Sequence, residues 1–356
     1  GTCSVMGTAS TMACIAEALG LTVPGGASPP APTAERMRVA ELTGTRAVQI
    51  ARERLTIDRV LTPAAFENAM RVLLAIGGST NAVVHLTAIA ARVGLQVDLD
   101  ALDRLGRETP VLLDLKPSGQ HYMEDFHAAG GMATLLRELR PLLQLDAPTV
   151  NGFSLGEQID AAGPGFAQDV VRPLSDPIYP QGGLAVLRGN LAPGGALIKA
   201  SAASPALMEH EGRAVVFEDA ADLAARIDDP ALDVAADDIL VLQRIGPKGA
   251  PGMPEAGALP IPLKLARAGV KDMVRISDGR MSGTAFGTVV LHVTPEAADG
   301  GPLAWVRTGD RIRLSVSRRE LVLKVSDEEL AARALAHPAL PPSAERGYRQ
   351  LFLRHV

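Results

Sequence analysis

The stretch ISDGRMSGTAFGTVVLHV, residues 276–293, decides the fold of the second half of this chain. Its apolar start ends at Ser277, a polar turn punctuated by glycine follows, and an apolar run resumes near residue 288. This order predicts two buried strands joined by a loop rich in hydroxyl groups. Small hydroxyl residues flanked by glycine at the end of a buried strand are well placed to meet a ligand, which makes Ser282 and Thr284 candidates. The offsets differ from those of the Gly-x-Ser-x-Gly elbow, so a serine-hydrolase triad is not predicted.

Short apolar runs of the same kind continue on both sides of this stretch. Only a few helical patterns interrupt them, at residues 219–227 and 326–336 for example. This pattern predicts a β-rich second domain, compatible with a barrel, that has helices at its margins. The runs are LAVLRG (184–189), ALIKAS (196–201), RAVVFE (213–218), DILVLQ (238–243), DMVRIS (272–277), TVVLHV (288–293), RIRLSV (311–316) and ELVLKV (320–325).

The first half of the chain reads as helices joined by glycine-marked loops. One short buried strand is predicted over PVLLDL, residues 110–115. The texture changes near residues 176–183, which we interpret as a linker between domains 1–178 and 179–356. The predicted helices run from Thr8 or Ser10 to about Leu19, from about Thr33 to Arg54, from Thr62-Pro63 to Gly77-Gly78, from Ser79-Thr80 to about Arg92, and onward from a capping box at Ser154.

Composition excludes several classes of protein. A chain of 356 residues is long for one core, so two domains are expected. The formal net charge of −5 argues against nucleic acid or an anionic membrane surface as a partner. No uninterrupted apolar stretch reaches a membrane-spanning length, and two cysteines are too few for a disulfide framework. We therefore expect a cytoplasmic enzyme.

Three further stretches could carry chemistry. In GTCSVMGT, residues 1–8, Cys3 lies in a loop against a predicted helix start, which suits a reactive or metal-bound thiolate; a small apolar residue in a tight turn is the alternative. The glycine- and proline-rich residues 246–262 surround one acid, Glu255, whose fixed carboxylate suits Mg²⁺; a rigid surface connection is the alternative. Residues 77–80, Gly-Gly-Ser-Thr, could seat a phosphate or carboxylate, or merely join two helices.

Together, and in this order, these segments resemble the dihydroxy-acid and phosphogluconate dehydratase family, also called IlvD/Edd. The resemblance runs over the whole chain. Within the family, RMSGTAFGTVVLHV is more similar to the sugar-acid dehydratases that act on arabinonate, xylonate or related aldonates. The segments that carry the resemblance are GTCSVMGTASTMACIAEALGL (1–21), GGSTNAVVHL (77–86), LKPSGQHYMEDFHAAGG (115–131), GPKGAPGMPEAG (246–257) and SDGRMSGTAFGTVVLHVTPEAA (277–298).

The resemblance implies roles for four residues. Cys3 matches a cysteine that binds an iron–sulfur cluster, [2Fe–2S] in the sugar-acid branch, with [4Fe–4S] as the alternative. Glu255 matches a carboxylate ligand of Mg²⁺. Ser282 matches the serine proposed to remove the substrate's C2 proton as its alkoxide, and Thr284 is expected to contact substrate. An open iron site would act as a Lewis acid on the C3 hydroxyl, and Mg²⁺ would stabilise the charge that develops as the proton leaves.

The resemblance also implies an architecture and a reaction. We expect an α/β N-terminal domain, a β-barrel-like C-terminal domain, and an active site between them in a homodimer or homotetramer. The expected reaction is dehydration of a 2,3-dihydroxy sugar acid, a small-molecule substrate, to a 2-keto-3-deoxy acid. The family's remaining cluster cysteines and Mg²⁺ ligands have no counterpart in this sequence, so we expect a fragment that is inactive alone. The alternatives are a branched-chain dihydroxy-acid dehydratase and a non-catalytic shortened relative.

Overall fold

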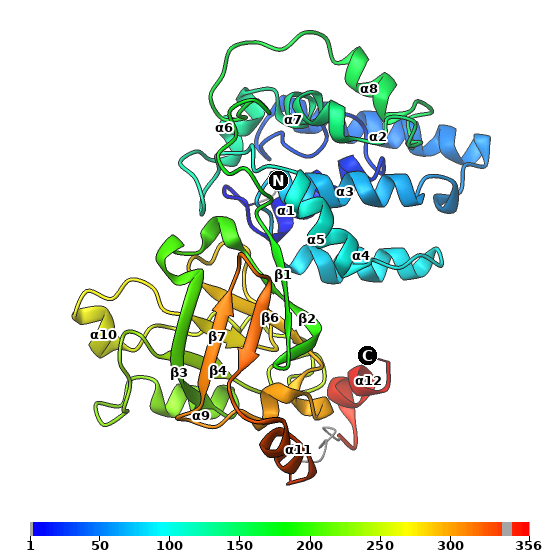
Figure 1. The fold of residues 1–356 in the computed structure, drawn as a ribbon. Helices are drawn as coiled ribbons and strands as arrows, with labels where there is room; N and C mark the ends of the chain where they lie inside the picture. Colours follow the sequence, from blue (N-terminus) through cyan, green and yellow to red (C-terminus); the bar gives the residue numbers. More distant parts are fainter. Residues whose placement is uncertain (1–2, 337–343, 356) are drawn as a thin grey trace. The chain divides into compact units, whose positions relative to one another are not determined.

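The computed structural model describes residues 3–336 and 344–355, and the chain divides into two compact units, Gly1–Leu184 and Ala185–Val356 (Figure 1). The division falls beyond the boundary expected after residue 178. Residues 176–183 hydrogen-bond within the first unit: the Gly182 amide donates to the Gly106 carbonyl (2.7 Å) and the Gly183 amide to that of Leu74 (3.0 Å). This segment, interpreted from the sequence as a linker, is therefore fastened to the first unit.

The described part of the first unit is built from α-helices, and α2, α3, α4 and α8 begin where the sequence predicts. Thr62 caps α3, because its hydroxyl accepts a hydrogen bond from the Ala65 amide, and Ser154 forms the expected capping box with Glu157. Helix α1 instead has Gly7 as its N-cap. The helices are α1 (Thr8–Ala18), α2 (Ala34–Glu53), α3 (Pro63–Ala75), α4 (Asn81–Arg92), α5 (Leu99–Glu108), α6 (Met123–Ala128), α7 (Gly131–Leu139) and α8 (Leu155–Ala161).

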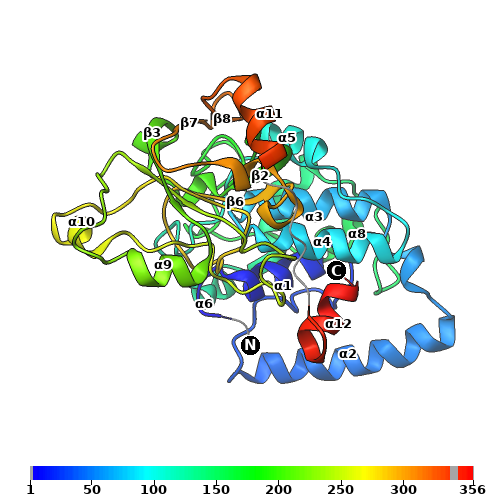
Figure 2. The same ribbon diagram turned by 90° about the horizontal axis from the view of Figure 1, so that it is seen from below.

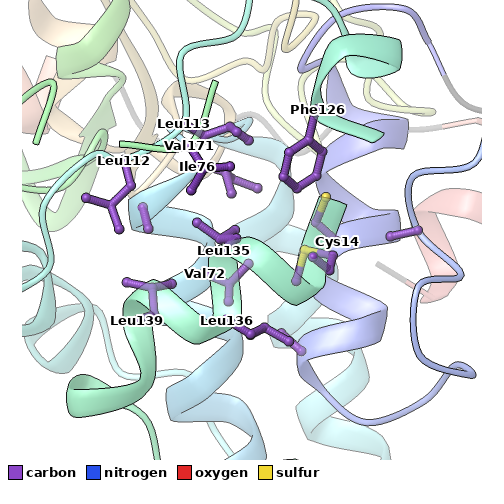
Figure 3. Packing of buried hydrophobic residues seen from close by; sticks show 14 of the residues in the cluster. Cys14, Val72, Ile76, Leu112, Leu113, Phe126, Leu135, Leu136, Leu139 and Val171 are labelled. Carbon is purple, nitrogen blue, oxygen red and sulfur yellow. The ribbon is translucent and has the colours of Figure 1, made fainter. Parts of the chain in front are cut away.

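The core of this unit lies between α1, α3, α6 and α7 (Figure 3). The strand predicted over residues 110–115 is wrong: its apolar side chains are buried, but its backbone forms only isolated bridges, such as Val111 with Tyr179 and Leu113 with Val171. Helix α2, seen as one long helix in Figure 2, has no buried residue. None of the helices in the described residues is long and apolar enough to cross a membrane.

The second unit is a closed barrel, which confirms the predicted fold class. Each of the eight apolar runs noted in the sequence overlaps one strand. The strand order around the barrel is β1-β2-β6-β5-β4-β3-β7-β8, and β8 closes on β1. The strands are β1 (Ala185–Gly189), β2 (Ala192–Ile198), β3 (Glu209–Phe217), β4 (Ile239–Leu242), β5 (Arg275–Ser277), β6 (Val289–Thr294), β7 (Arg311–Ser315) and β8 (Glu320–Leu323).

Inward-facing side chains from all eight strands fill the barrel, as alternation along each strand requires. The outer face of β3 and β4 is covered by a second cluster, in which α9 (Ala220–Arg226) and α10 (Leu263–Arg267) take part. Helix α11 (Asp327–Ala336) also packs at the barrel margin, and α12 (Gly347–His355) follows it in the chain. Strands β3, β4, β5 and β6 run parallel in the order β3-β4-β5-β6, and this arrangement determines where the candidate site forms.

Candidate functional site

The candidate residues of the second unit lie on two of the three connections that join the parallel strands β3, β4, β5 and β6. A parallel pair cannot be joined by a tight hairpin, so the chain must cross back from the end of one strand to the start of the next. Residues 243–274 cross from β4 to β5 and carry Glu255, and residues 278–288 cross from β5 to β6 and carry Ser282 and Thr284. Because β4 and β5 are neighbours, these two crossovers begin side by side.

Hydrogen bonds then hold the two crossovers together. The Gly257 amide donates to the Arg280 carbonyl (2.8 Å), and the Arg280 guanidinium donates to the Met253 carbonyl (2.6 Å). The same guanidinium forms an ion pair with Glu255, with Nη1 2.9 Å from Oε1. The proposed metal ligand and the segment that leads to Ser282 are thus linked through one arginine.

Ser282 and Thr284 lie next to each other in the second crossover. Their hydroxyl oxygens are 2.8 Å apart, and the Ser282 Oγ also accepts from the Thr284 amide at 3.4 Å. Thr284 is exposed and Ser282 is half-buried, so both hydroxyls are accessible to a small molecule. The sequence prediction that these two residues act at one place is compatible with this geometry.

Arg275 at the start of β5 forms hydrogen bonds with both crossovers. Its buried guanidinium donates to the Ala258 and Leu259 carbonyls of the first crossover, both at 3.1 Å, and to the Phe286 carbonyl of the second at 3.3 Å. An ion pair with Asp272 (2.8 Å) compensates its charge. Sequence reasoning missed this residue, although an arginine inside an apolar strand run is a signal for a buried polar anchor.

Two buried carboxylates fix the other ends of these loops. Asp278 accepts from the Ile245 amide (2.9 Å) and the Ala297 amide (2.8 Å), and burial raises its pKa to about 6. Glu296 accepts from the amides of Lys248 and Gly249, both at 2.9 Å. These bonds satisfy backbone amides that have no partner in a β-sheet. They also link the loops that follow β4, β5 and β6 to one another.

Cys3 lies in the first unit, where three of the sequence segments meet. The Met123 amide donates to the Ser4 carbonyl and the Met6 amide to the Lys116 carbonyl, both at 2.8 Å. The Thr8 hydroxyl lies 3.0 Å from that of Ser79. Exposed Cys3 faces a cavity of about 380 Å³ whose other lining residues are Ser4, Ser28, Pro29, Pro30, Ala31, Pro32, Tyr122, Met123 and Glu124.

The buried carboxylate of Glu17 holds the turn at residues 25–27, which directly precedes the cavity-lining residue Ser28. Glu17 on α1 accepts from the amides of Gly25 (2.7 Å) and Ala27 (2.9 Å), and burial raises its pKa to about 7.

Because the folded chain holds the proton of the Glu17 carboxyl more tightly than the unfolded chain, the free energy of unfolding should fall as pH rises from about 4.5 to 7. We expect a loss of about 3 kcal/mol in the free energy of unfolding over this range, and Glu17→Gln should remove it. Denaturant melts at several pH values measure this, and equal slopes for both proteins would contradict it.

The two cysteines should differ sharply in reactivity. Cys14 is fully buried among the residues shown in Figure 3, and burial raises the pKa of its thiol. Only an accessible thiolate reacts readily. Titration with a chromogenic disulfide should therefore count one thiol in the folded chain and two in denaturant, and Cys3→Ser should lower each count by one. Labelling of Cys14 under native conditions would contradict this assignment.

The prediction of a phosphate- or carboxylate-binding site at residues 77–80 is wrong. The Gly78 amide donates to the Leu73 carbonyl, the Ser79 amide donates to the Thr11 hydroxyl, and Ser79 is fully buried. A Cβ at Gly78 would lie 2.7 Å from Leu73 and 2.8 Å from Thr11. The glycine is needed for close packing of α1 on α3, and these amides are not available to an anion.

The described residues do not by themselves complete either metal site implied by the resemblance. Within residues 3–336 and 344–355, no three His, Cys, Asp or Glu side chains are grouped so as to hold a metal ion. Cys3 offers one thiol, whereas an iron–sulfur cluster needs several ligands. Glu255 offers one carboxylate, which pairs with Arg280. Each residue could serve as one ligand among several.

Comparison with known proteins bears on both units. Residues 1–158 match the family model described as dihydroxy-acid/6-phosphogluconate dehydratase N-terminal, and residues 169–356 match the corresponding C-terminal one. An L-arabonate dehydratase of Azospirillum brasilense is 52% identical over 353 residues, which cover 97% of this chain and 60% of the relative.

Other relatives carry different substrate names. A 6-deoxy-6-sulfo-D-gluconate dehydratase of Pseudomonas putida is 48% identical over 100% of this chain and 62% of its own length. A dihydroxy-acid dehydratase of Methanosarcina barkeri is 41% identical over 100% of this chain and 64% of its own length. The chain thus spans about three fifths of the length of these relatives.

Proposed function

The chain belongs to the dihydroxy-acid/6-phosphogluconate dehydratase family, and from this premise we propose that it forms part of a hydro-lyase that dehydrates a sugar acid. The observation that carries the proposal is that Arg280 links the crossover that carries Ser282 and Thr284 to the crossover that carries Glu255. The reaction converts a 2,3-dihydroxy acid into a 2-keto-3-deoxy acid by loss of water.

Ser282 is the proposed base. Its alkoxide removes the proton from C2, the C3 hydroxyl leaves as hydroxide, and this hydroxide takes the proton from Ser282 to give water and restore the alkoxide. The resulting enol becomes the keto acid when C3 takes a proton from solvent and the enol hydroxyl loses one. A serine hydroxyl is a weak base unless its alkoxide is stabilised nearby. The Thr284 hydroxyl, 2.8 Å from Ser282 Oγ, can donate a hydrogen bond to such an alkoxide and can also contact the substrate.

Two cofactors are part of the proposal. Cys3 would be one ligand of an iron–sulfur cluster, [2Fe–2S] or [4Fe–4S], and Glu255 one ligand of Mg²⁺. An exposed thiol beside a cavity and an accessible carboxylate on a fixed loop support these roles. Both groups need more ligands than the described residues provide.

Self-association into a homodimer or homotetramer is also proposed. Helix α2 has no buried residue, and it exposes Met37, Leu42 and Val48 by 70%, 58% and 53%. Large apolar side chains gathered on one exposed helix are typical of interfaces between subunits.

An aldonate is the proposed substrate class, because relatives named for sugar acids are 48–52% identical and the dihydroxy-acid dehydratase is 41% identical. The test is an anaerobic assay of a chimera that joins this chain to the segments of the A. brasilense protein that it does not match. Iron, sulfide and Mg²⁺ are supplied, and keto acid is measured. Faster turnover of L-arabinonate than of 2,3-dihydroxyisovalerate would support the aldonate assignment. The reverse order would overturn the aldonate assignment, and no turnover of either acid would overturn the proposed reaction.

A further inference from the structure

Lys199, directly after β2, is a buried cation without an acidic partner. Only 2% of its surface is exposed, and it is one of the largest fully buried side chains in the described residues. Its Nζ donates one long hydrogen bond, 3.5 Å, to the Gly283 carbonyl. Among the described residues, no carboxylate lies within 4.0 Å of Nζ to form an ion pair.

Two other buried cations of this unit have a carboxylate partner, unlike Lys199. Arg275 pairs with Asp272 at 2.8 Å, and Arg333 pairs with Asp310 at 2.6 Å. Burial of an uncompensated charge is costly, and here burial lowers the pKa of Lys199 to about 8. The ammonium is still mostly protonated at pH 7. A buried charge without a carboxylate partner can be compensated by a negative group of a bound ligand.

The place of Lys199 identifies where that group would bind. In the β2–β6 register, Leu197 pairs with Leu291 and Ile198 with Val290, so Lys199 lies at the entrance to β6, where the second crossover ends. Residues 202–204, which follow Lys199, hydrogen-bond to the end of the same crossover. The Gly287 amide donates to the Ala202 carbonyl (3.0 Å), and the Ser204 amide donates to the Thr288 hydroxyl (3.1 Å). Gly283, which Lys199 contacts, stands between Ser282 and Thr284 in the chain.

We propose that Lys199 determines specificity for acids, because its buried ammonium compensates the carboxylate of a hydroxy acid that binds at the Ser282–Thr284 hydroxyl pair. The inference rests on the proposed function and deepens it. Lys199 makes and breaks no bond in the reaction; it selects an anionic substrate over a neutral polyol with the same hydroxyl groups. A charge held in a low-dielectric site is effective in this role, since little solvent screens it.

The test compares an acid with a neutral polyol on the full 356-residue chain. The probes are L-arabinonate and L-arabinitol, which share their hydroxyl pattern and differ in the carboxylate, and binding is measured by calorimetry. Lys199→Gln keeps a donor for the Gly283 carbonyl and removes the charge, and Lys199→Met removes both. Lys271→Met, at an exposed lysine of the same unit, is the matched control.

We expect L-arabinonate to bind the wild type and the Lys271 variant equally and both Lys199 variants at least about 10-fold more weakly, as loss of a charge-assisted hydrogen bond predicts. L-Arabinitol should not distinguish the four proteins. Without ligand, Lys199→Met should melt a few degrees higher than wild type, because a desolvated charge is gone, whereas loss of a structural contact would lower the melting temperature.

Two results would overturn the inference: equal L-arabinonate affinity in wild type and Lys199→Gln, or no binding of L-arabinonate to the wild type. Both are separate from failure of the proposed function, which is measured as absence of turnover by the chimera. Turnover that retains its preference for acids in Lys199→Gln would reject Lys199 and leave the dehydratase assignment intact.

Discussion

Ser282→Ala should lower keto-acid formation by the chimera about 1,000-fold, within the range that a positioned general base contributes. Alanine removes the oxygen that takes the C2 proton and keeps the bond from the Ala285 amide to the carbonyl of residue 282, while it loses the 3.4 Å bond from the Thr284 amide to Oγ. Binding of L-arabinonate should change little, because its carboxylate is expected to bind at Lys199. The measurement is the rate of keto-acid formation at saturating substrate, with the visible absorption of the cluster recorded to show equal loading.

Two control variants separate a catalytic role from a structural one. Ser317→Ala removes an exposed hydroxyl from the turn between β7 and β8 and should leave the rate unchanged. Thr284→Val removes the hydrogen-bond partner of Ser282 and should cost about 10-fold, less than loss of the base itself. A Ser282→Ala protein with more than a tenth of the wild-type rate would assign the base to another residue.

Arg275→Met is expected to have the largest effect on stability, a loss of about 3–5 kcal/mol in the free energy of unfolding. The substitution leaves Asp272 buried without its ion-pair partner and frees the carbonyls of Ala258, Leu259 and Phe286. Because Arg275 holds both crossovers, hydrogen exchange should accelerate at residues 255–259 and 282–287 before the rest of the barrel opens. Denaturant melts and hydrogen exchange measure the two effects.

Arg267→Met is the matched control, because Arg267 lies exposed at the end of α10. A surface change of this kind should stay within about 0.5 kcal/mol. If Arg275→Met were no more destabilising than the control, Arg275 could not be the anchor of the two loops.

Much of the fold could be predicted from local patterns. Each of the eight apolar runs of the second half overlaps a strand, and the signals at Thr62 and Ser154 mark true helix starts. The order of strands around the barrel could not be predicted, because pairing depends on long-range contacts that leave no local trace. The run at residues 110–115 shows the limit, since a buried apolar segment need not find a continuous strand partner.

The candidate site was predicted only in part. Hydroxyl and acid residues in glycine-rich loops indicated Ser282, Thr284 and Glu255 as candidates, whereas the residues that hold those loops stand inside strand-like runs. Lys199 and Arg275 were not selected from the sequence, and the structure shows that both are buried. A charged residue within an apolar run is the one local signal of such an anchor.

The most direct test of the central claim, that this chain carries the base of a sugar-acid dehydratase, is the isotopic content of the product. The chimera is incubated with L-arabinonate in heavy water, and the product is examined by proton NMR. Loss of the C2 proton and protonation of an enol predict a 2-keto-3-deoxy acid with one deuterium at C3, formed by the wild type and not by Ser282→Ala. Absence of keto acid, or a keto acid without deuterium at C3, would contradict the account.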